Sequence, residues 1–348
     1  MKKKIALIGG ARPNFMKIAP LCRKLERRNI PYFIVNTGQH FDSNMAGDFF
    51  KEFEIFPNYE LHPSRNSVIK QVSDIICGLE KIFISEKPYM VVVVGDVNST
   101  LAAALVANKM NIKLAHVEAG LRSHNKQMPE EFNRVMVDHI SDILFVTSEG
   151  GVLNLEEEGI TENVFFVGNI MIDTIKMFVK NIDLSKETFY FCTLHRAENI
   201  DNKRDFQNIL NALEVISKDE KIYLSLHPRT KKMAEKFGLS RRLNQIFSIL
   251  PPLSYKESLF YQKNAKLVLT DSGGIQEETS FLGVPCITLR IETERPVTVE
   301  EGTNTVGGVS RDSILKSYRN KKLVRKKTNI TKWDGKAAKR IIDIILKS

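Results

Sequence analysis

Short apolar runs rich in β-branched and aromatic residues alternate with longer segments of helical pattern along the first half of the chain. These runs cover residues 4–8, 32–35, 89–94, 113–117 and 143–146. Residues 90–94 are apolar throughout, as expected for a parallel strand that is buried on both faces of its sheet. Residues 99–110 follow with a helical pattern. The alternation predicts a doubly wound α/β domain built on a parallel sheet.

A second series of the same kind begins after residue 170. Its strand-like runs cover residues 189–194, 222–226, 267–270 and 286–289, with loops rich in Gly, Pro and Ser between them. We therefore expect two Rossmann-like domains of similar size, residues 1–170 and residues 171–333. A last helical segment, residues 334–348, is expected to pack back on the first domain and complete it.

Composition narrows the class of protein. The chain has 348 residues and is 43% hydrophobic, which is enough for two cores. The apolar run after the N-terminal lysines stops at Gly9 and is too short for a signal peptide, and no stretch approaches the roughly 20 apolar residues of a membrane span. We therefore expect a cytoplasmic protein. Its cysteines lack CxxC spacing, which predicts reduced core thiols rather than a zinc or redox site; they are Cys22, Cys77, Cys192 and Cys286.

The formal net charge of +10 favours an anionic partner, which could be nucleic acid, anionic lipid or a phosphorylated metabolite. Much of the excess lies in residues 319–327, where no aromatic residues are interleaved to stack on bases. A solvated basic surface is the favoured interpretation, and we expect neither nucleic acid nor a membrane as partner. A nucleic-acid-binding protein stays as a distant alternative, which steeply salt-dependent binding would reveal.

Loops that follow strands carry the candidate chemistry, because parallel strands end at one common edge of their sheet. The first loop, residues 9–17, has two glycines followed by Arg12 and Lys17, which could face an anion. On this segment alone, an ordinary turn with a surface arginine explains the pattern equally well. The loop lacks the glycine spacing of dinucleotide-binding and P-loop proteins, which argues against use of NAD and hydrolysis of ATP.

Acids at three places in the first domain are candidates for proton transfer. Asp96 and Glu118 each lie beyond an apolar strand, Asp96 directly after Gly95 and Glu118 two residues before Gly120. A buried acid there costs stability unless it serves a ligand. Glu130 and Glu131 follow Pro129, and there acids also stabilise the start of a helix without any ligand. The chain has no H-E-x-x-H and no G-x-S-x-G motif, so zinc hydrolysis and serine nucleophiles have no support. No metal site is expected.

The second domain offers groups suited to a diphosphate. Ser272, Gly273 and Gly274 end a strand with small residues that let a diphosphate approach the start of the next helix. Glu278 lies one helical turn further and could accept hydrogen bonds from a ribose diol. His195 and His227 each follow a strand of this domain, whereas the sequence leaves the roles of His40 and His116 open.

Nine short motifs stand in one order over both halves of the chain. They are G-A-R-P-N-F-M-K at 10–17, T-G-Q-H at 37–40, G-D at 95–96, H-V-E-A-G-L-R at 116–122, P-E-E-F-N-R at 129–134, G-N at 168–169, H-R-A-E-N at 195–199, D-S-G-G-I-Q-E-E at 271–278 and T-E-R-P at 293–296. Together they resemble the non-hydrolysing UDP-N-acetylglucosamine 2-epimerases over nearly the whole chain. The resemblance implies a glycosyltransferase-B-like fold, with two Rossmann-like domains facing each other across a cleft that holds the nucleotide sugar. It also implies homodimers that need no metal and no nicotinamide cofactor.

The resemblance further implies a reaction that serves cell-surface polysaccharide synthesis. UDP is eliminated from UDP-GlcNAc in the anti sense to give 2-acetamidoglucal, and UDP then adds back with protonation on the opposite face of C2 to give UDP-ManNAc. By position, Asp96, Glu118 and Glu130 are similar to the acid–base set of the family. His195 is similar to the residue that assists the departing diphosphate.

The resemblance also assigns the groups that bind substrate. Those similar to the diphosphate and sugar contacts are Arg12, Lys17, Ser272, Gly273, Gly274 and Arg295. Glu278 would bind the ribose, and the loop from Leu253 to Ser258 would meet the uracil. Two departures stand out: the loop at 122–129 is shorter than in many members, and Ser258 replaces a residue that is often aromatic.

Three alternatives stay open at this point. Gln39 and Arg65 are compatible with the second, activating UDP-GlcNAc site of some bacterial members, but Asp42 and Asn66 differ, so the sequence leaves such regulation open. H-P-R-T at 227–230 resembles relatives that epimerise UDP-2,3-diacetamido-2,3-dideoxyglucuronic acid. A retaining glycosyltransferase of the same fold would share the diphosphate and ribose groups but would not explain three acids in the first domain.

Overall fold

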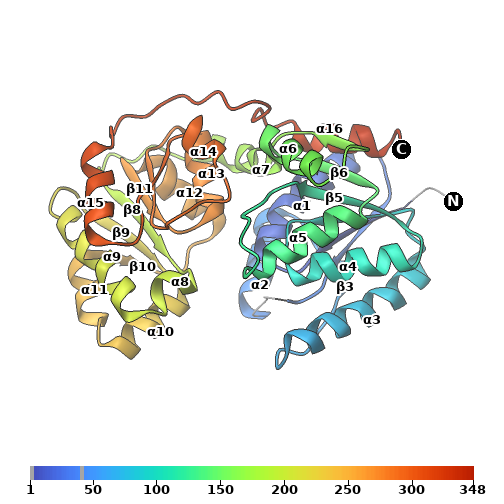
Figure 1. Ribbon diagram of the computed structural model, residues 1–348, viewed down its shortest axis with the longest axis horizontal. Helices are drawn as coiled ribbons and strands as arrows, with labels where there is room; N and C mark the ends of the chain where they lie inside the picture. The colour runs from blue at the N-terminus through green and yellow to red at the C-terminus, as the bar shows by residue number, and fades with distance from the viewer. Residues whose placement is uncertain (1–3, 40–42) are drawn as a thin grey trace. The chain divides into compact units, whose positions relative to one another are not determined.

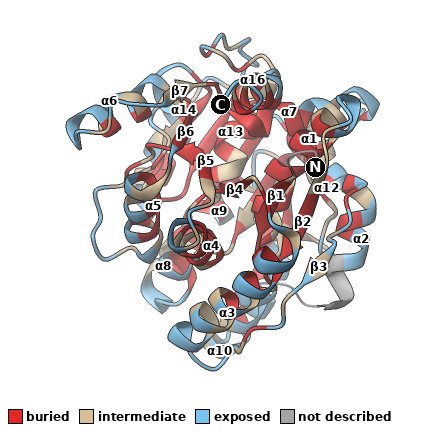
Figure 2. Ribbon diagram, turned by 90° about the vertical axis from the view of Figure 1, so that its right-hand side faces the viewer, coloured by how far each residue is buried: buried red, intermediate tan, exposed pale blue. Residues whose placement is uncertain are grey.

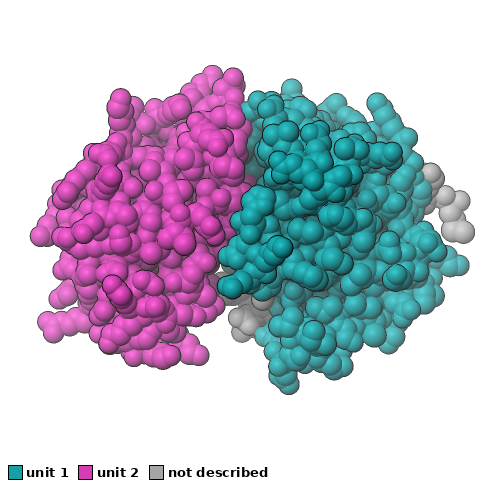
Figure 3. Space-filling model, viewed as in Figure 1, with its two compact units in different colours: residues 1–174, 331–348 teal, residues 175–330 magenta. Residues whose placement is uncertain are grey.

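The computed structural model describes residues 4–39 and 43–348, and the chain divides into two compact α/β units (Figure 1 and Figure 3). Unit 1 comprises Met1–Thr174 and Thr331–Ser348, and unit 2 comprises Ile175–Ile330. Each unit is built on one parallel sheet. The central strands of both sheets are buried, as Figure 2 shows for unit 1, whereas the edge strands are only partly buried.

The sheet of unit 1 has seven parallel strands in the order β3-β2-β1-β4-β5-β6-β7. The strands are β1 (Ile5–Gly9), β2 (Tyr32–Asn36), β3 (Tyr59–Glu60), β4 (Met90–Val94), β5 (Lys113–Ala119), β6 (Ile143–Val146) and β7 (Val164–Phe166). The chain passes from β1 outward to β3 and then returns to β4 on the other side of β1. Ligands of open α/β sheets bind at the carboxyl ends of the strands where such a reversal occurs. The loops after β1 and β4 are therefore the place for a site.

Helices cover both faces of this sheet (Figure 1). They are α1 (Arg12–Arg27), α2 (Ser43–Phe53), α3 (Val68–Glu86), α4 (Asn98–Lys109), α5 (Pro129–Ile140), α6 (Glu149–Glu157), α7 (Ile170–Phe178) and α16 (Ala337–Ile345). α16 packs on α1. The carboxylate of Asp173 accepts hydrogen bonds from the amides of Ala337 and Ala338 at 3.0 and 3.2 Å, which satisfies the first turn of α16.

Unit 2 repeats the architecture with six parallel strands in the order β10-β9-β8-β11-β12-β13. The strands are β8 (Tyr190–Leu194), β9 (Ile222–Leu226), β10 (Phe247–Leu250), β11 (Leu267–Thr270), β12 (Cys286–Thr288) and β13 (Asn304–Val306). The helices are α8 (Ala197–Ile200), α9 (Lys203–Ile216), α10 (Pro228–Phe237), α11 (Ser240–Ile246), α12 (Tyr255–Asn264), α13 (Gly273–Leu282), α14 (Val297–Glu300) and α15 (Arg311–Asn320), with a 3₁₀ turn at Val179–Asn181. The order reverses between β8 and β11, so the loops after these two strands are the equivalent place for a site.

Burial of the thiols differs in part from the prediction. Cys22, Cys192 and Cys286 are buried free thiols, but the prediction is wrong for Cys77, which is exposed on α3. That helix buries only one stripe of side chains, including Ile75 and Leu79, and Cys77 lies outside the stripe. Within the part of the chain that the structure describes, no helix has both the length and the apolar character to cross a membrane.

Candidate active site

Asn14 joins the two strand ends at the reversal point of unit 1. Its side-chain oxygen accepts hydrogen bonds from the amides of Gly10 and Ala11 at 3.2 and 3.0 Å, and its Nδ2 donates to the carbonyl of Val94 at 2.8 Å. A side chain at Gly10 would collide with the hydroxyls of Thr37 and Ser99. Only glycine therefore allows the loop to lie this close to them. Asn14 was not among the predicted site residues, although it stands inside the first motif.

Lys17 and Glu118 form a buried ion pair at this point, with the side chains only 10% and 6% exposed. Glu118 adopts a φ of +78°, a left-handed conformation that non-glycine residues rarely take. The pairing of β5 with β6 shifts in register between Val117 and Ala119, around this residue. Its carboxylate lies close to Gly95, because a Cβ there would be 3.4 Å from Oε2. The structure thus brings together Lys17, Glu118 and the loop of Asp96.

Asp96 lies just after β4 and forms an ion pair with Arg134 of α5. The carboxylate is 31% exposed, whereas Arg134 is only 6% exposed in its side chain. Asn133 donates from Nδ2 to the backbone oxygen of Asp96 at 2.8 Å, which fixes the loop from the same helix. Arg134 and Asn133 were not predicted as site residues. Their signal was the P-E-E-F-N-R motif, but only the fold shows that α5 reaches the end of β4.

The two adjacent acids at the start of α5 have different environments. Glu131 is buried and accepts hydrogen bonds from the amide of Ser123 at 2.9 Å and the amide of His124 at 2.8 Å. Burial alone would raise the pKa of Glu131, but these hydrogen bonds and Arg134 lower it overall. Glu130 is half-buried, and no hydrogen bond of its side chain occurs among the described residues. Glu131 therefore anchors the loop at 122–129, while Glu130 is available to a ligand.

Arg12 begins α1, directly after the glycine loop. Its guanidinium carbon lies 5.1 Å from the ring centroid of Phe49, a cation–π distance. Partial burial lowers the pKa of Arg12, and nearby Glu52 opposes the effect. Gln39 accepts hydrogen bonds from the amide and hydroxyl of Ser99 at 2.9 and 2.8 Å. His40 and Asp42, which the sequence also raised, lie outside the described residues.

His195 and Asp271 form the centre of the equivalent place in unit 2. Asp271 is fully buried, and its Oδ2 accepts hydrogen bonds from the amides of His195 and Arg196, both at 2.9 Å. Its Oδ1 lies 2.9 Å from Nδ1 of His195. Burial would raise the pKa of Asp271, but the hydrogen bond and charge of His195 lower it below the ordinary value. The carboxylate thereby holds the imidazole in one orientation. Asp271 was not predicted, although it opens a quoted motif.

The first turn of α13 offers free amides to an anion. Ser272 is the residue before the helix, and within the described chain its side chain caps none of the helix amides. Gly273 leaves room for Arg295, since a Cβ there would lie 2.7 Å from the Nη1 atom of the arginine. Nε of Arg295 donates to Glu277 at 2.8 Å, which keeps the guanidinium over the helix start. This helix end combines an electropositive dipole with a fixed cation.

Glu278 is buried one turn further along α13, only 3% exposed. Nε2 of Gln262 donates to its Oε2 at 2.7 Å and lies 3.2 Å from the hydroxyl of Ser258 on α12. Burial raises the pKa of Glu278, and hydrogen bonds from Gln262 and Tyr255 only partly offset the rise. The resulting pKa is about 7. The predicted ribose acid and Ser258 are thus linked through one glutamine. Leu253 is half-buried at the start of the same segment and packs on the core of unit 2.

His227 lies beside His195, with ring centroids 5.7 Å apart. Partial burial and the neighbouring His195 lower the pKa of His227. Its Nδ1 accepts a hydrogen bond from the amide of Arg229 at 3.2 Å. Arg229 in turn forms an exposed ion pair with Asp201, Nε to Oδ1 at 3.1 Å. The H-P-R-T segment therefore belongs to the same sheet edge as His195.

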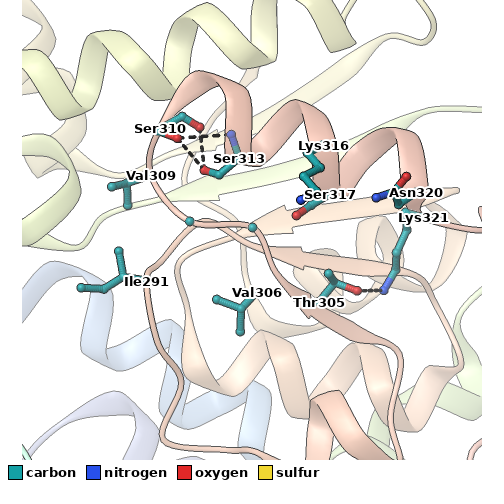
Figure 4. Close-up of a pocket in the computed structure, with 12 residues that line it drawn as sticks. Ile291, Thr305, Val306, Val309, Ser310, Ser313, Lys316, Ser317, Asn320 and Lys321 are labelled. Atoms are coloured by element: carbon teal, nitrogen blue, oxygen red, sulfur yellow. Dashed lines mark hydrogen bonds between the residues drawn. The ribbon is translucent and has the colours of Figure 1, made fainter.

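A separate pocket of about 630 Å³ lies between β13 and α15 in unit 2 (Figure 4). It contains none of the predicted site residues. Several of its polar groups are already paired: Lys321 donates to Thr305 at 2.6 Å, and the hydroxyls of Ser310 and Ser313 bond at 2.8 Å. Across residues 4–39 and 43–348, no group of three or more His, Cys, Asp or Glu side chains could hold a metal ion.

The protein has two doubly wound units. One carries ion-paired acids, and the other has an open helix start beside a histidine–aspartate pair. This arrangement is that of an enzyme of the glycosyltransferase-B-like class. Residues 23–346 match the family model described as UDP-N-acetylglucosamine 2-epimerase. The chain therefore belongs to the UDP-N-acetylglucosamine 2-epimerase family, whose members are isomerases. The predicted resemblance, fold class and enzyme class are confirmed.

Named relatives agree over almost the whole chain. The UDP-N-acetylglucosamine 2-epimerase of Methanocaldococcus jannaschii is 42% identical over 365 residues, covering 98% of each protein. A crystal structure of the M. jannaschii UDP-GlcNAc 2-epimerase with UDP-GlcNAc and UDP has a TM-score of 0.91 at 41% identity and covers 99% of this chain and 100% of that one. The UDP-2,3-diacetamido-2,3-dideoxy-D-glucuronate 2-epimerase of Pseudomonas aeruginosa is 38% identical over 327 residues, 91% of each protein.

Proposed function

We propose that this protein interconverts UDP-GlcNAc and UDP-ManNAc. The observation that carries the proposal is the acid–base cluster of unit 1, where Asp96 follows β4 and Glu118 lies at the carboxyl end of the neighbouring β5. Each carboxylate is ion-paired with a basic side chain. Glu118 is held there in a left-handed backbone conformation, and such strain is concentrated at functional sites. The similar M. jannaschii enzyme, crystallised with UDP-GlcNAc and UDP, supports the choice of substrate.

In the first half of the reaction, a carboxylate removes the proton at C2 of the sugar. The electron pair of that bond forms the C1–C2 double bond of 2-acetamidoglucal, and the C1–O bond breaks with its pair leaving on UDP. In the second half, UDP adds back to C1 and a carboxylic acid delivers a proton to the opposite face of C2. We assign these proton transfers to Asp96, Glu118 and Glu130. One proton and UDP leave the sugar in the first half, and one proton and UDP are added in the second, so the balance requires no redox cofactor.

Groups of unit 2 bind UDP in this proposal. The diphosphate accepts hydrogen bonds from the free amides of Gly273 and Gly274 at the start of α13, beside the side chain of Ser272. His195 and Arg295 are further fixed donors. As UDP departs, negative charge grows on the diphosphate, and donors already held in place stabilise it without reorganisation.

The remaining binding roles follow the sequence assignment. Glu278 meets the ribose hydroxyls, and the segment from Leu253 to Ser258 meets the uracil. Arg12 and Lys17 contribute positive charge to the diphosphate and sugar. We also propose that the enzyme works as a cytoplasmic homodimer that supplies precursors for cell-surface polysaccharide.

UDP-2,3-diacetamido-2,3-dideoxyglucuronic acid is the second candidate substrate. The observation that favours it is the position of His227 and Arg229 at the edge that carries His195, since a sugar carboxylate would gain from added donors. The P. aeruginosa relative is named for this sugar.

Comparing kcat/KM for the two nucleotide sugars decides between them. We expect UDP-GlcNAc to be the better substrate. A higher kcat/KM for the uronic acid nucleotide would show that this sugar is the preferred substrate instead. Product formed only when a sugar acceptor is added would indicate a glycosyltransferase and overturn both.

A further inference from the structure

The carboxyl end of β5 is held in an unfavourable backbone conformation. Glu118 has a φ of +78°, and Gly120, two residues later, also has a φ of +78°. The left-handed conformation costs a residue with a side chain about 1–2 kcal/mol, so neighbouring contacts must impose it. The pairing of β5 with β6 also shifts in register between Val117 and Ala119, and such an irregularity redirects the side chain at that position. Here it directs Glu118 to Lys17.

One oxygen of Asp138 fixes the chain directly after this register shift. Asp138 lies on α5 and is 1% exposed. Its Oδ2 accepts a hydrogen bond from the amide of Gly120 at 3.0 Å and another from Nη1 of Arg122 at 2.7 Å. Arg122 also pairs with Glu158 through two bonds of 2.6 Å. The guanidinium therefore keeps a carboxylate partner even without Asp138.

The other oxygen of Asp138 reaches the loop of Asp96 through His116. Oδ1 lies 2.6 Å from Nδ1 of the fully buried His116, and Nε2 of His116 lies 2.9 Å from the carbonyl oxygen of Gly95. A carbonyl oxygen only accepts, so Nε2 carries a proton and donates it. The amide of Gly95 donates to the carbonyl of Val117 at 3.0 Å. One buried carboxylate thus connects the residues next to both assigned acids.

We propose that Asp138 is a positioning residue for the epimerase reaction. It holds Gly120 and the carbonyl of Gly95 in place, and through them it fixes Glu118 and Asp96 in their reactive geometry. This inference rests on the proposed function, because that function makes these two acids the proton-transfer groups. Asp138 acts through other residues and is fully enclosed by protein. Replacing a buried polar network by packed apolar groups is often neutral for stability, so a purely stabilising role does not explain its presence at this edge.

Two substitutions separate geometry from charge. In Asp138→Asn, the amide oxygen still accepts from Gly120 and Arg122, and the amide N–H can donate to Nδ1 of a neutral His116. We expect its kcat to stay within about fivefold of the wild type. Asp138→Ala removes both links, and a misplacement of about 1 Å costs on the order of 100-fold. We expect that loss in kcat, with an unchanged dissociation constant for UDP.

Asp142→Ala is the matched control. Asp142 also accepts a hydrogen bond from a backbone amide of β5. This amide, of Leu114, lies 2.7 Å away at the opposite end of the strand. Its kcat should equal that of the wild type. The proposal is wrong if Asp138→Ala matches this control, if Asp138→Asn is as inactive as Asp138→Ala, or if UDP binding falls together with kcat. Should Asp138→Ala fail to fold, His116→Asn keeps the bond to Asp138 and removes only the link to Gly95. We expect kcat to fall about tenfold in that variant, and an unchanged kcat would refute the proposal.

A crystal structure of Asp138→Ala provides a readout that does not depend on turnover. The proposal predicts that Glu118 leaves the positive-φ region and loses its contact with Lys17. If Glu118 keeps its conformation there, the proposal fails, whatever the activity of the enzyme. If instead the wild type epimerises no UDP-sugar but Glu118 moves in this variant, the proposed function fails and the positioning of Glu118 by Asp138 stands.

Discussion

Replacing Asp271 by asparagine tests how unit 2 holds His195. In the wild type, one oxygen of the buried carboxylate accepts hydrogen bonds from the amides of His195 and Arg196. The other oxygen faces Nδ1 of His195. Asparagine has the same shape and can keep one oxygen toward both amides. The charge is lost, and the nitrogen of the new amide faces the imidazole. The change therefore removes charge with little change of packing.

The magnitude follows from the two backbone hydrogen bonds. A hydrogen bond to an ionised acceptor contributes about 1.5–3 kcal/mol, against about 0.5–1.5 for a neutral one, so each bond weakens by about 1 kcal/mol. We expect Asp271→Asn to lower the free energy of unfolding by about 2 kcal/mol at pH 7. Because folding lowers the pKa of Asp271, its contribution is present above the unfolded pKa of about 4 and is lost as pH falls through the folded value. The difference from wild type should therefore shrink in acid.

Urea unfolding followed by circular dichroism at pH 7 and at about pH 3.5 measures both effects. Asp201→Asn is the control, because this carboxylate is 43% exposed in an ion pair with Arg229 and should contribute little. The kcat of Asp271→Asn should also fall about 100-fold, since a fixed donor at the departing diphosphate loses its charged partner. If the variant loses no more stability than Asp201→Asn, or the loss is equal at both pH values, the reasoning about Asp271 is refuted.

Two further predictions concern acids whose environments differ. Glu278→Gln should stabilise the protein at pH 8 relative to the wild type and have little effect near pH 5. Folding raises the pKa of Glu278 to about 7, so the contribution of this group to stability is fully present below its unfolded pKa. That contribution is lost as pH rises through 7, and glutamine, which does not ionise, avoids the loss. Thermal unfolding at the two pH values checks this, and equal effects at both would contradict it. Glu130→Gln should lose most turnover with an unchanged melting temperature, whereas Glu131→Gln should lower the melting temperature, because Glu131 accepts backbone amides of the 122–129 loop. The reverse pattern would show that Glu131 is the reacting group.

Local patterns were sufficient to predict the inner strands of both sheets and the loops that follow them, but not the edge strands β3, β10 and β13. The apolar run at 90–94 is the central strand β4, and the helix expected at 99–110 is Asn98–Lys109. Asp96 and Glu118 stood out because each ends such an apolar run close to a glycine, Gly95 and Gly120 respectively. These signals are short in sequence, since side-chain alternation and turn residues act within a few positions.

The partners of these acids could not be predicted, because they depend on the strand order. Lys17 and Glu118 are 101 positions apart and meet only because β1, β4 and β5 are neighbours. Asp138 reaches His116 from a different element, and no local pattern marks an aspartate near the end of a helix as part of a site. The exposure of Cys77 likewise depends on which stripe of α3 faces the sheet.

Proton NMR in deuterated water tests the central claim, that the chain epimerises a UDP-sugar through elimination of UDP. The purified enzyme is incubated with UDP-GlcNAc, and the C2 signals of UDP-GlcNAc and UDP-ManNAc are followed over time. The account predicts that UDP-ManNAc appears with deuterium at C2, because the proton delivered to the opposite face comes from a carboxylic acid that exchanges with solvent. Formation of UDP-ManNAc that retains hydrogen at C2 would contradict the proton-transfer mechanism. If UDP-GlcNAc stays unchanged, and the diacetamido uronic acid nucleotide in a separate incubation does too, the proposed function is contradicted.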